Sequence, residues 1–380
     1  MRKICVVVTA RPSYSRIKTL LDEINSSDKL ELQLILSASA LIKRYGSVVN
    51  VVENDGFKIS KKIYSTIEGD NQSIAPKSTA ILISELSSAF LTLKPDIVLT
   101  IADRYETIST SIAASYMNIP LAHIQGGEVT GNIDEKVRHA NTKLADYHFV
   151  SSEDSYKRVV KLGENPKFVF NTGCPSIDLA KNIGDLNFDP YKKYGGVGNK
   201  PNYNLGYTVV MQHPVTNEYE QSEKHIIETI EAIIKLDMTV FWFWPNVDSG
   251  TDSISKTIRK YRERKDFNKV HFFKNFEPRD FLTLLKNSKC LIGNSSVGIR
   301  ECSFLNVPVL NIGTRQNKRL RGNNVLDCEN NRVEIFNKIQ ILLNNKTSQS
   351  SDIYGNGTAG FQIAKILETV ELTSHKTIEY

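Results

Sequence analysis

The sequence lacks the features that mark several large classes of protein. Its five cysteines are scattered and include no C-x-x-C pair, so neither a disulfide framework nor a cysteine zinc site is predicted. No apolar run approaches the ~20 residues of a membrane span, and the N-terminal KICVVV is too short for the core of a signal peptide. The histidines are dispersed without the spacing of metal ligands. We therefore expect a cytoplasmic protein with no membrane partner and no metal.

Charge and glycine patterns exclude further classes. The formal net charge of +6 favours a small anionic substrate, but it is too mild and too dispersed to indicate nucleic-acid binding. The most basic run, KTIRKYRERKDFNK, has helical spacing and indicates a solvated helix face. Neither G-x-x-x-x-G-K-[ST] nor G-x-G-x-x-G occurs, so a P-loop NTPase is excluded and we expect no dinucleotide or other cofactor.

Short apolar, β-branched runs alternate with amphipathic segments along the chain. ICVVVT, LELQLILSA, DIVLTI, PLAHI and YHFVS lie in the first half, and YTVVMQ, TVFWFW, VHFFK, CLIGN and VPVLNIG in the second. Such continuous apolar strands between helices predict parallel sheets covered on both faces. The rhythm breaks at 182–206, a stretch rich in Gly, Asn, Pro and Tyr that indicates a linker. We therefore predict an α/β protein with Rossmann-like domains at 1–181 and 207–356, and a ligand cleft between the carboxyl ends of their strands.

In the first domain, polar residues follow the predicted strands directly. Arg11, Ser13 and Ser15 stand in TARPSYSR, in what should be the turn before a helix, where they suit a phosphate or form a plain N-cap. Asp103 and Arg104 follow DIVLTI, where the aspartate is a candidate catalytic acid or another N-cap.

The segment HIQGGEVTGNIDEKVRHANTKLADYHF, residues 123–149, is the densest in polar groups. Its double glycine predicts a close approach of backbone to a ligand. Helical spacing in the following helix predicts a stripe facing the core, and Asp134 at the helix start also suits the helix dipole. Several polar groups beside the double glycine favour a reaction centre. The stripe comprises Ile133, Val137, Ala140 and Leu144, and the polar groups are Gln125, Glu128, Asp134 and Arg138.

In the second domain, His213 follows VVMQ before a proline, and Asn246 and Asp248 follow FWFWP. A histidine at a strand end is a plausible acid or base near neutral pH. IGNSSVGIRE predicts a strand, a glycine turn and a helix over 297–304, so that Ser295 and Ser296 with free N–H groups form an anion site. Glu301 is placed to accept both hydroxyls of a ribose. An acid-rich first domain and a phosphate-binding second domain fit a nucleotide-sugar enzyme.

These same residues resemble those of the UDP-N-acetylglucosamine 2-epimerases, in particular the hydrolysing branch that supplies sialic-acid-type sugars. The resemblance spans about residues 3–370. The motifs that carry it are ARPSYS, KPDIVL, DRYE, HIQGGEVTGNIDEKVRHANTKLADYHF, GCPSID, QHPVT, PNVDSG, IGNSSVGIRE, GTRQ and GNNVL. It implies a GT-B-like arrangement of the two domains with a cleft between them, a C-terminal helix over 357–376 that returns to the first domain, and a homodimer or homotetramer.

The resemblance also implies a reaction, in which UDP-GlcNAc and water give N-acetylmannosamine and UDP. UDP leaves by anti elimination to a 2-acetamidoglucal, water then adds at C1, and a proton returns to C2 from the opposite face. Roles in catalysis are implied for Asp103, Gln125, Glu128, Asp134 and His213. Substrate-binding roles are implied for Arg11, Ser15, Arg104, Arg138, Asn246, Phe276, Ser295, Ser296, Glu301 and Arg315, with the backbone near Phe276 on the uracil, and His213 also assists departure of UDP.

One position departs from the family pattern. Gln125 stands where many members carry a catalytic glutamate, and a neutral amide cannot abstract a proton at pH 7. Either Glu128 or Asp134 takes over this role, or the substrate is a UDP-2,4-diacetamido-2,4,6-trideoxy sugar of the legionaminic acid route, whose acetamido group Gln125 would orient. A GT-B glycosyltransferase and an inactive UDP-sugar binding protein remain as alternatives.

Overall fold

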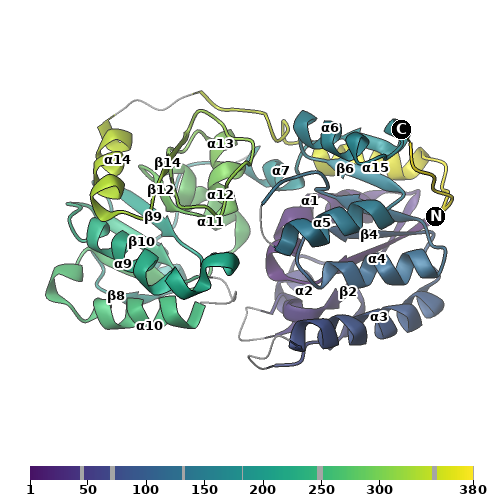
Figure 1. The fold of residues 1–380 in the computed structure, drawn as a ribbon, viewed down its shortest axis with the longest axis horizontal. Helices are drawn as coiled ribbons and strands as arrows, with labels where there is room; N and C mark the ends of the chain where they lie inside the picture. The colour runs from purple at the N-terminus through teal and green to yellow at the C-terminus, as the bar shows by residue number, and fades with distance from the viewer. Residues whose placement is uncertain are drawn as a thin grey trace. The chain divides into compact units, whose positions relative to one another are not determined.

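The computed structural model describes residues 1–42, 47–68, 73–130, 133–181, 183–245, 251–344 and 349–379. The chain divides into two compact units (Figure 1). Unit 1 comprises 1–129, 133–178 and 353–380, and unit 2 comprises 130–132 and 179–352. Each unit has its own sheet and its own hydrophobic core.

The sheet of unit 1 has seven parallel strands in the order β3-β2-β1-β4-β5-β6-β7. Alternate residues of β1 enter different cores: Ile4, Val6 and Val8 pack under α1 and α15, while Cys5 and Val7 pack under α3 and α4. Helices thus cover both faces of the sheet. The strands are β1 (Arg2–Val8), β2 (Leu30–Ser37), β3 (Ile59–Ile63), β4 (Ile97–Ile101), β5 (Leu121–Ile124), β6 (Tyr147–Val150) and β7 (Val169–Asn171). The helices are α1 (Arg11–Ser26), α2 (Val49–Asn54), α3 (Ile74–Leu93), α4 (Thr107–Tyr116), α5 (Ile133–Leu144), α6 (Glu153–Lys161), α7 (Pro175–Lys181) and α15 (Ala359–Thr369).

The sheet of unit 2 has the order β14-β13-β12-β9-β10-β11-β8, parallel except for the edge strand β8. Its strands are β8 (Val197–Gly198), β9 (Tyr207–Met211), β10 (Thr239–Phe243), β11 (Val270–Phe273), β12 (Leu291–Gly293), β13 (Val309–Ile312) and β14 (Val325–Cys328). Its helices are α8 (Pro190–Tyr194), α9 (Ser222–Ile233), α10 (Thr251–Arg262), α11 (Pro278–Lys286), α12 (Ser296–Ile299), α13 (Glu301–Leu305) and α14 (Arg332–Asn344). Read outward from β1 and from β9, both sheets have the doubly wound order typical of Rossmann folds.

Two boundaries differ from the sequence expectation. The segment 182–206 is more than a linker, because it carries α8 and the strand β8, and its ring of Tyr191 packs on Phe241 and Phe273 of unit 2. The C-terminal helix expected over 357–376 is shorter, since α15 covers Ala359–Thr369 and an extended tail follows it. Asp178 accepts the backbone N–H groups of Ala359 and Gly360, so a carboxylate from α7 caps the start of α15.

All five cysteines are buried free thiols, and Cys5, Cys290 and Cys302 belong to the hydrophobic cores, as their apolar neighbours predict. Among the helices that the structure describes, none combines the length and the apolar character needed to cross a membrane.

Candidate active site

The candidate residues of unit 1 gather where its strand order reverses. β1 and β4 are neighbours, and the chain leaves them toward opposite edges of the sheet. Arg11 stands three residues after β1, and Asp103 two residues after β4. In doubly wound sheets, ligands bind outside the carboxyl ends of the strands at this switch point.

Asp103 is held by one of its two oxygens. Oδ2 forms an ion pair with Nη2 of Arg138, whose side chain is 1% exposed. Oδ1 makes no hydrogen bond with the described residues, and the Asp103 side chain is 15% exposed. The alternative of a helix N-cap does not apply, because α4 begins at Thr107 with Glu106 at its N-cap. Asp103 is therefore a carboxylate that is fixed through Oδ2, while none of the described residues binds its Oδ1.

Arg138 also organises the double-glycine loop. Its Nη1 donates to the backbone carbonyl of Glu128 over 2.9 Å, and Glu128 Oε1 accepts a hydrogen bond from Ser151 Oγ over 2.8 Å. The side chains of Glu128 and Arg138 are both buried. Arg104 lies beside this group and pairs with the buried Glu106 through two contacts of 3.2 Å. One buried guanidinium thus links Asp103 to the loop that carries Glu128.

The double glycine serves the packing of the protein itself, and a ligand approach at this loop stays a prediction. A Cβ on Gly126 would lie 3.0 Å from both His123 Nδ1 and Thr142 Oγ1. Gly127 has φ +75°, and its Cβ would lie 2.4 Å from the carbonyl oxygen of Ser155. Protein atoms occupy the space that the missing side chains leave. The glycines allow the loop to lie directly on its neighbours.

The predicted core stripe of α5 is confirmed only at Leu144, which packs against the core under α3 and α4. Val137, Ala140 and Leu144 are only partly buried, and the side chain of Ile133 lies outside the described set. The buried face of α5 is polar instead, and it carries Arg138, Asn141 and Thr142.

Hydrogen bonds to α4 explain this inversion. Asn141 Oδ1 accepts from Ser111 Oγ, and its Nδ2 donates to Thr107 Oγ1, each over 2.8 Å. Polar groups can be buried when they find such partners. Asp134 lies partly buried in the first turn of α5, and Glu135 pairs with His139 over 3.4 Å.

Arg11 and Ser15 lie in the first turns of α1, and the expected turn before the helix is absent. The helix begins at Arg11, because Pro12 fits the first turn of a helix without losing a hydrogen bond. Ser15 Oγ lies 3.4 Å from the carbonyl of Arg11, and Ser13 is buried. Both Arg11 and Ser15 remain partly exposed.

Gln125 is fixed at the end of β5 with one unmet acceptor. Its backbone has φ 66°, and its side chain is 2% exposed. Nε2 lies 2.9 Å from Cys174 Sγ, while the buried Oε1 has no hydrogen-bond partner among the described residues.

In unit 2, the strand order reverses between β9 and β12, and Asn294 joins the two strand ends. The backbone N–H of His213 donates to Asn294 Oδ1 over 2.8 Å, and Asn294 Nδ2 donates to the carbonyl of His213 over 2.9 Å. His213, which is buried, is therefore held by its backbone at this switch point.

The helix expected over 297–304 is broken into α12 and α13 at Arg300. Ser295 is the N-cap of α12, and Ser296 Oγ accepts from Arg300 Nη2 over 3.2 Å. Glu301 is buried, with Oε2 3.9 Å from Arg300 Nε. Phe276 is also buried, and its ring stacks on Tyr194 with centroids 3.7 Å apart.

A basic loop after β13 also reaches the β12 end. Arg315 Nη1 and Gln316 Nε2 donate to the carbonyl of Asn294 over 3.2 and 2.9 Å. The sequence analysis missed the buried Arg300 and Arg319, and also Arg321, which donates to the carbonyl of Gln316 over 2.8 Å. The dense cations of TRQNKRLRG were the available signal. Asn246 and Asp248 lie outside the described residues.

The described part of the chain contains no group of His, Cys, Asp and Glu side chains arranged to hold a metal ion.

Comparison of the sequence with models of known protein families identifies the class of this protein. A family model described as UDP-N-acetylglucosamine 2-epimerase matches residues 22–368. The chain belongs to the UDP-N-acetylglucosamine 2-epimerase family. The resemblance drawn from the motifs is thereby confirmed, and with it the enzyme class, a nucleotide-sugar 2-epimerase.

The names of the relatives of this epimerase refer to two different sugars. It is 35% identical over 89% of its length, and 88% of the relative, to a GDP/UDP-N,N'-diacetylbacillosamine 2-epimerase (hydrolyzing) of Campylobacter jejuni. It is 30% identical over 98% of its length, and 97% of the relative, to a UDP-N,N'-diacetylbacillosamine 2-epimerase (hydrolyzing) of Legionella pneumophila. It is 28% identical over 97% of its length, and 95% of the relative, to a UDP-N-acetylglucosamine 2-epimerase of Neisseria meningitidis.

Solved structures confirm the fold class, two α/β domains with parallel sheets of the GT-B-like type. A UDP-GlcNAc 2-epimerase of Neisseria meningitidis, bound to UDP-GlcNAc, matches with a TM-score of 0.78 at 20% identity over 96% of this chain and 99% of that one. S. aureus MnaA with UDP matches with a TM-score of 0.79 at 19% identity over 97% and 96%.

Proposed function

We propose that this epimerase hydrolyses a UDP-linked 2-acetamido sugar while inverting C2, and that its preferred sugar is the 2,4-diacetamido-2,4,6-trideoxy type. The hydrolysing class is supported by the printed names of the Campylobacter and Legionella relatives. The same names support the diacetamido sugar, and they reverse the order of preference expected from the motifs. UDP-GlcNAc stays the second candidate because the Neisseria relative bears its name.

The observation that carries the reaction is the half-bound carboxylate of Asp103. Its Oδ2 is fixed on Arg138, and its Oδ1 makes no hydrogen bond with the described residues. A group that transfers a proton must be held in place and must still present a free oxygen. In the proposed reaction, one carboxylate takes the C2 proton as the C1–O bond to UDP breaks and a C1–C2 double bond forms. A second acid then delivers a proton to C2 from the opposite face as water adds at C1 and loses its own proton. Asp103 is assigned to one step, with Asp134 or Glu128 for the other.

Binding of the nucleotide is assigned to unit 2 and to Arg11, Ser15 and Arg104. Ser295, Ser296 and Arg315 are assigned to the diphosphate, Glu301 to the ribose, Asn246 to the sugar and the backbone near Phe276 to the uracil. The basic loop of unit 2 supports this assignment, because cations stabilise the charge that develops on departing UDP. His213 assists that departure.

Gln125 supports the diacetamido sugar. Its amide end is occupied by Cys174, and its buried Oε1 lacks a partner among the described residues. A carbonyl in this position accepts an N–H and cannot take up a proton at pH 7. We assign it to the N–H of the 4-acetamido group, which UDP-GlcNAc lacks.

The deciding experiment is proton NMR in D₂O with each UDP-sugar in turn. The proposal expects UDP and a free 2-epimerised diacetamido sugar that carries deuterium at C2. Turnover of UDP-GlcNAc alone would assign the second candidate. If neither sugar reacts, the proposed function fails and a glycosyltransferase or an inactive binding protein takes its place.

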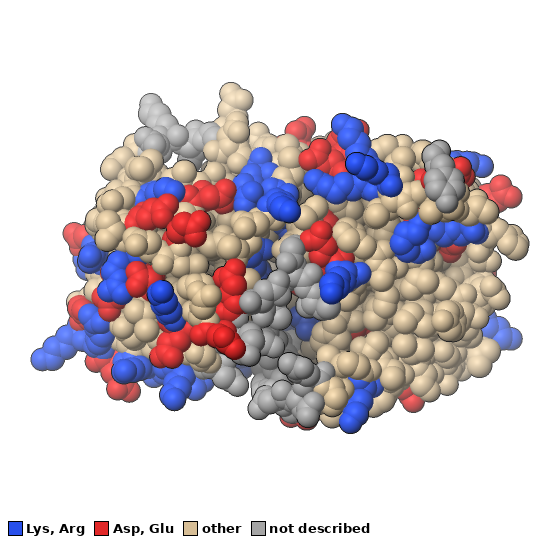
Figure 2. Space-filling model, viewed as in Figure 1, with Lys and Arg blue, Asp and Glu red and all other residues tan. Residues whose placement is uncertain are grey.

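Self-association is proposed through α3 and α4, which pack on each other. Ile108 and Ile112 of α4 are partly buried, Tyr116 is 83% exposed, and α4 contains no charged residue. The surface over α3 and α4 shows few charges (Figure 2). An uncharged face lets two copies of a cationic protein meet without repulsion. Sedimentation should show a homodimer or homotetramer that Ile112→Glu dissociates, and an unchanged sedimentation coefficient would contradict this.

A further inference from the structure

Two buried histidines lie in register on neighbouring strands but contact different partners. His123 of β5 pairs with His148 of β6. His148 Nε2 lies 3.0 Å from Glu164 Oε2, whereas His123 Nε2 lies 3.0 Å from the carbonyl oxygen of Ala102. Because a carbonyl only accepts, Nε2 of His123 carries the proton and donates it. Ala102 is the residue directly before Asp103.

The backbone at Ala102 is unusual and is held on both sides. Its φ of +62° is in the left-handed region, which a residue with a Cβ rarely adopts without support from its surroundings. Its N–H donates to the carbonyl of Ile124 over 3.0 Å, and its carbonyl accepts from His123. These two bonds fix the direction in which the chain leaves β4, and therefore the place of Asp103.

The other ring nitrogen of His123 leads to the partner of Asp103. Burial lowers the pKa of His123 to about 4, so the ring is neutral at pH 7 and Nδ1 is an acceptor. Nδ1 lies 3.1 Å from Thr142 Oγ1, and the same hydroxyl lies 3.1 Å from the carbonyl of Arg138 one turn earlier in α5. The hydroxyl contacts both acceptors and donates its single proton to one of them at a time. Gly126 leaves the room for this contact, because a Cβ there would meet both His123 and Thr142.

We propose that His123 is a positioning residue for Asp103, through a closed ring of contacts that runs Asp103–Arg138–Thr142–His123–Ala102. The ring fixes both the backbone that leads into Asp103 and the helix turn that supplies its guanidinium. His123 itself is fully buried and touches no substrate; it sets the direction in which Asp103 Oδ1 points. This inference rests on the proposed role of Asp103.

The test compares three variants at matched thermal stability. His123→Phe keeps a ring and removes the donor to Ala102. It should lower kcat by about 100-fold with KM and the Kd for UDP nearly unchanged, since small misplacements of a reacting group cost about this much. His123→Gln, whose amide N–H can reach the same carbonyl, should restore most of kcat. His148→Phe, the matched control on β6, should leave kcat within about twofold, because its ring faces Glu164.

Three results would overturn the inference: normal kcat in His123→Phe, an equal loss in His123→Gln, or an equal loss in His148→Phe. If His123→Phe does not fold, Thr142→Val serves instead, since it keeps the shape and removes the hydroxyl between Nδ1 and Arg138. It should lower kcat at least about tenfold without changing KM, and normal kcat would count against the ring.

Asp103→Asn measured in parallel separates this inference from the proposed function. If Asp103→Asn turns over normally, the role of Asp103 fails. If Asp103→Asn is inactive and His123→Phe is normal, only the positioning role fails. The double variant should be no slower than Asp103→Asn alone, because both changes act on one group.

Discussion

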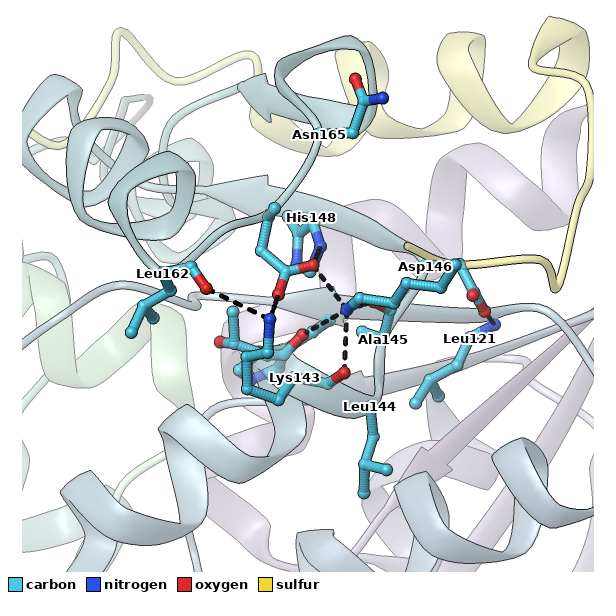
Figure 3. A network of polar contacts seen from close by, with 12 residues as sticks. Leu121, Lys143, Leu144, Ala145, Asp146, His148, Leu162 and Asn165 are labelled. Carbon is cyan, nitrogen blue, oxygen red and sulfur yellow. Dashed lines mark hydrogen bonds and ion pairs between the residues drawn. The ribbon is translucent and has the colours of Figure 1, made fainter. Parts of the chain in front are cut away.

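The two ends of the unit 1 sheet each hold an acid bound to cations, and the acids differ in what is left free. At the carboxyl ends, Asp103 uses Oδ2 for Arg138 and leaves Oδ1 without a hydrogen bond to the described residues. At the amino ends, Glu164 uses both oxygens: Oε1 contacts Lys143 over 2.7 Å, and Oε2 contacts His148 and Lys376 (Figure 3). Glu164 is 1% exposed. An acid whose oxygens are all occupied stabilises the fold, while an acid with an open oxygen can transfer a proton.

Glu164 also ties the C-terminal tail to α5. Lys376 donates to the backbone carbonyls of Thr142, Lys143 and Ala145, which are the free acceptors at the end of α5 (Figure 3). The tail therefore caps the end of the helix whose first half carries Asp134 and Arg138. α5 thus carries candidate reacting groups near the carboxyl ends of the unit 1 strands and structural contacts near their amino ends.

The largest effect on kcat is expected at Asp103, the acid with an open oxygen. Asp103→Asn keeps the shape of the side chain and removes its ability to take up a proton, so kcat should fall by about 10³-fold. The Kd for UDP should change little, and so should the melting temperature. Calorimetric titration with UDP and the D₂O NMR assay measure these quantities. Near-normal turnover would remove the distinction between the two acids.

At Glu164, whose two oxygens are both occupied, substitution should lower stability and leave turnover unchanged. Burial alone would raise the pKa of Glu164, but the hydrogen bonds from His148, Lys143 and Lys376 lower it from 4.5 to about 2. A carboxylate with a lowered pKa stabilises the fold above pH 4.5, and this contribution is lost as pH falls toward 2. Glu164→Gln should lower the free energy of unfolding by about 3 kcal/mol at pH 7, with kcat retained.

Urea unfolding at pH 7, 4.5 and 2.5 measures this, and the difference between wild type and Glu164→Gln should shrink toward the acid end. Glu153→Gln is the matched control, because Glu153 is 63% exposed and pairs with Lys157 at 3.6 Å. It should change stability by less than about 0.5 kcal/mol. A pH-independent difference for Glu164→Gln would refute the electrostatic account.

The strand ends could be predicted from sequence, since apolar β-branched runs mark parallel strands and the next residues must lie at the carboxyl edge. Asp103, Glu128, His213 and Ser295 were placed in this way. The short strand ISKKI was missed because its charged residues interrupt the apolar pattern, yet it forms β3 at the edge of the sheet.

The packing around the strand ends could not be predicted. Periodicity assigned the apolar side of α5 to the core, but Asn141 and Thr142 find their partners on α4 and in His123, which lie far away in sequence. Gly126 lies against the side chains of His123 and Thr142 for the same reason. Helical spacing tells which residues share a face; it does not tell which face finds hydrogen-bond partners.

A smaller effect is expected in unit 2, on binding rather than chemistry. Arg315→Ala removes a cation that we assign to the diphosphate, and the Kd for UDP should rise about 10- to 100-fold, as for the loss of a hydrogen bond to a charged group. kcat at saturating substrate should change less. The exposed Lys318 of the same loop provides the control, since Lys318→Ala should leave the Kd within about twofold. Equal effects of both variants would mean that only the net charge of the loop matters.

The smallest effect is expected at Gln125, and it concerns the choice of sugar. Gln125→Glu introduces the acid that many family members carry and removes the N–H that meets Cys174 Sγ. A buried carboxylate carries a desolvation cost that a neutral amide avoids, and it gains the ability to accept a proton. The ratio of kcat/KM for the diacetamido sugar to that for UDP-GlcNAc should fall about tenfold, which corresponds to about 1.4 kcal/mol of transition-state discrimination. Both rates are read from one NMR competition experiment, with Gln125→Met as the control that removes the amide without adding charge.

If Gln125→Met and Gln125→Glu shift the ratio equally, the loss of the amide is what matters and Gln125 contacts the sugar. An unchanged ratio in both variants would show that Gln125 only packs against Cys174.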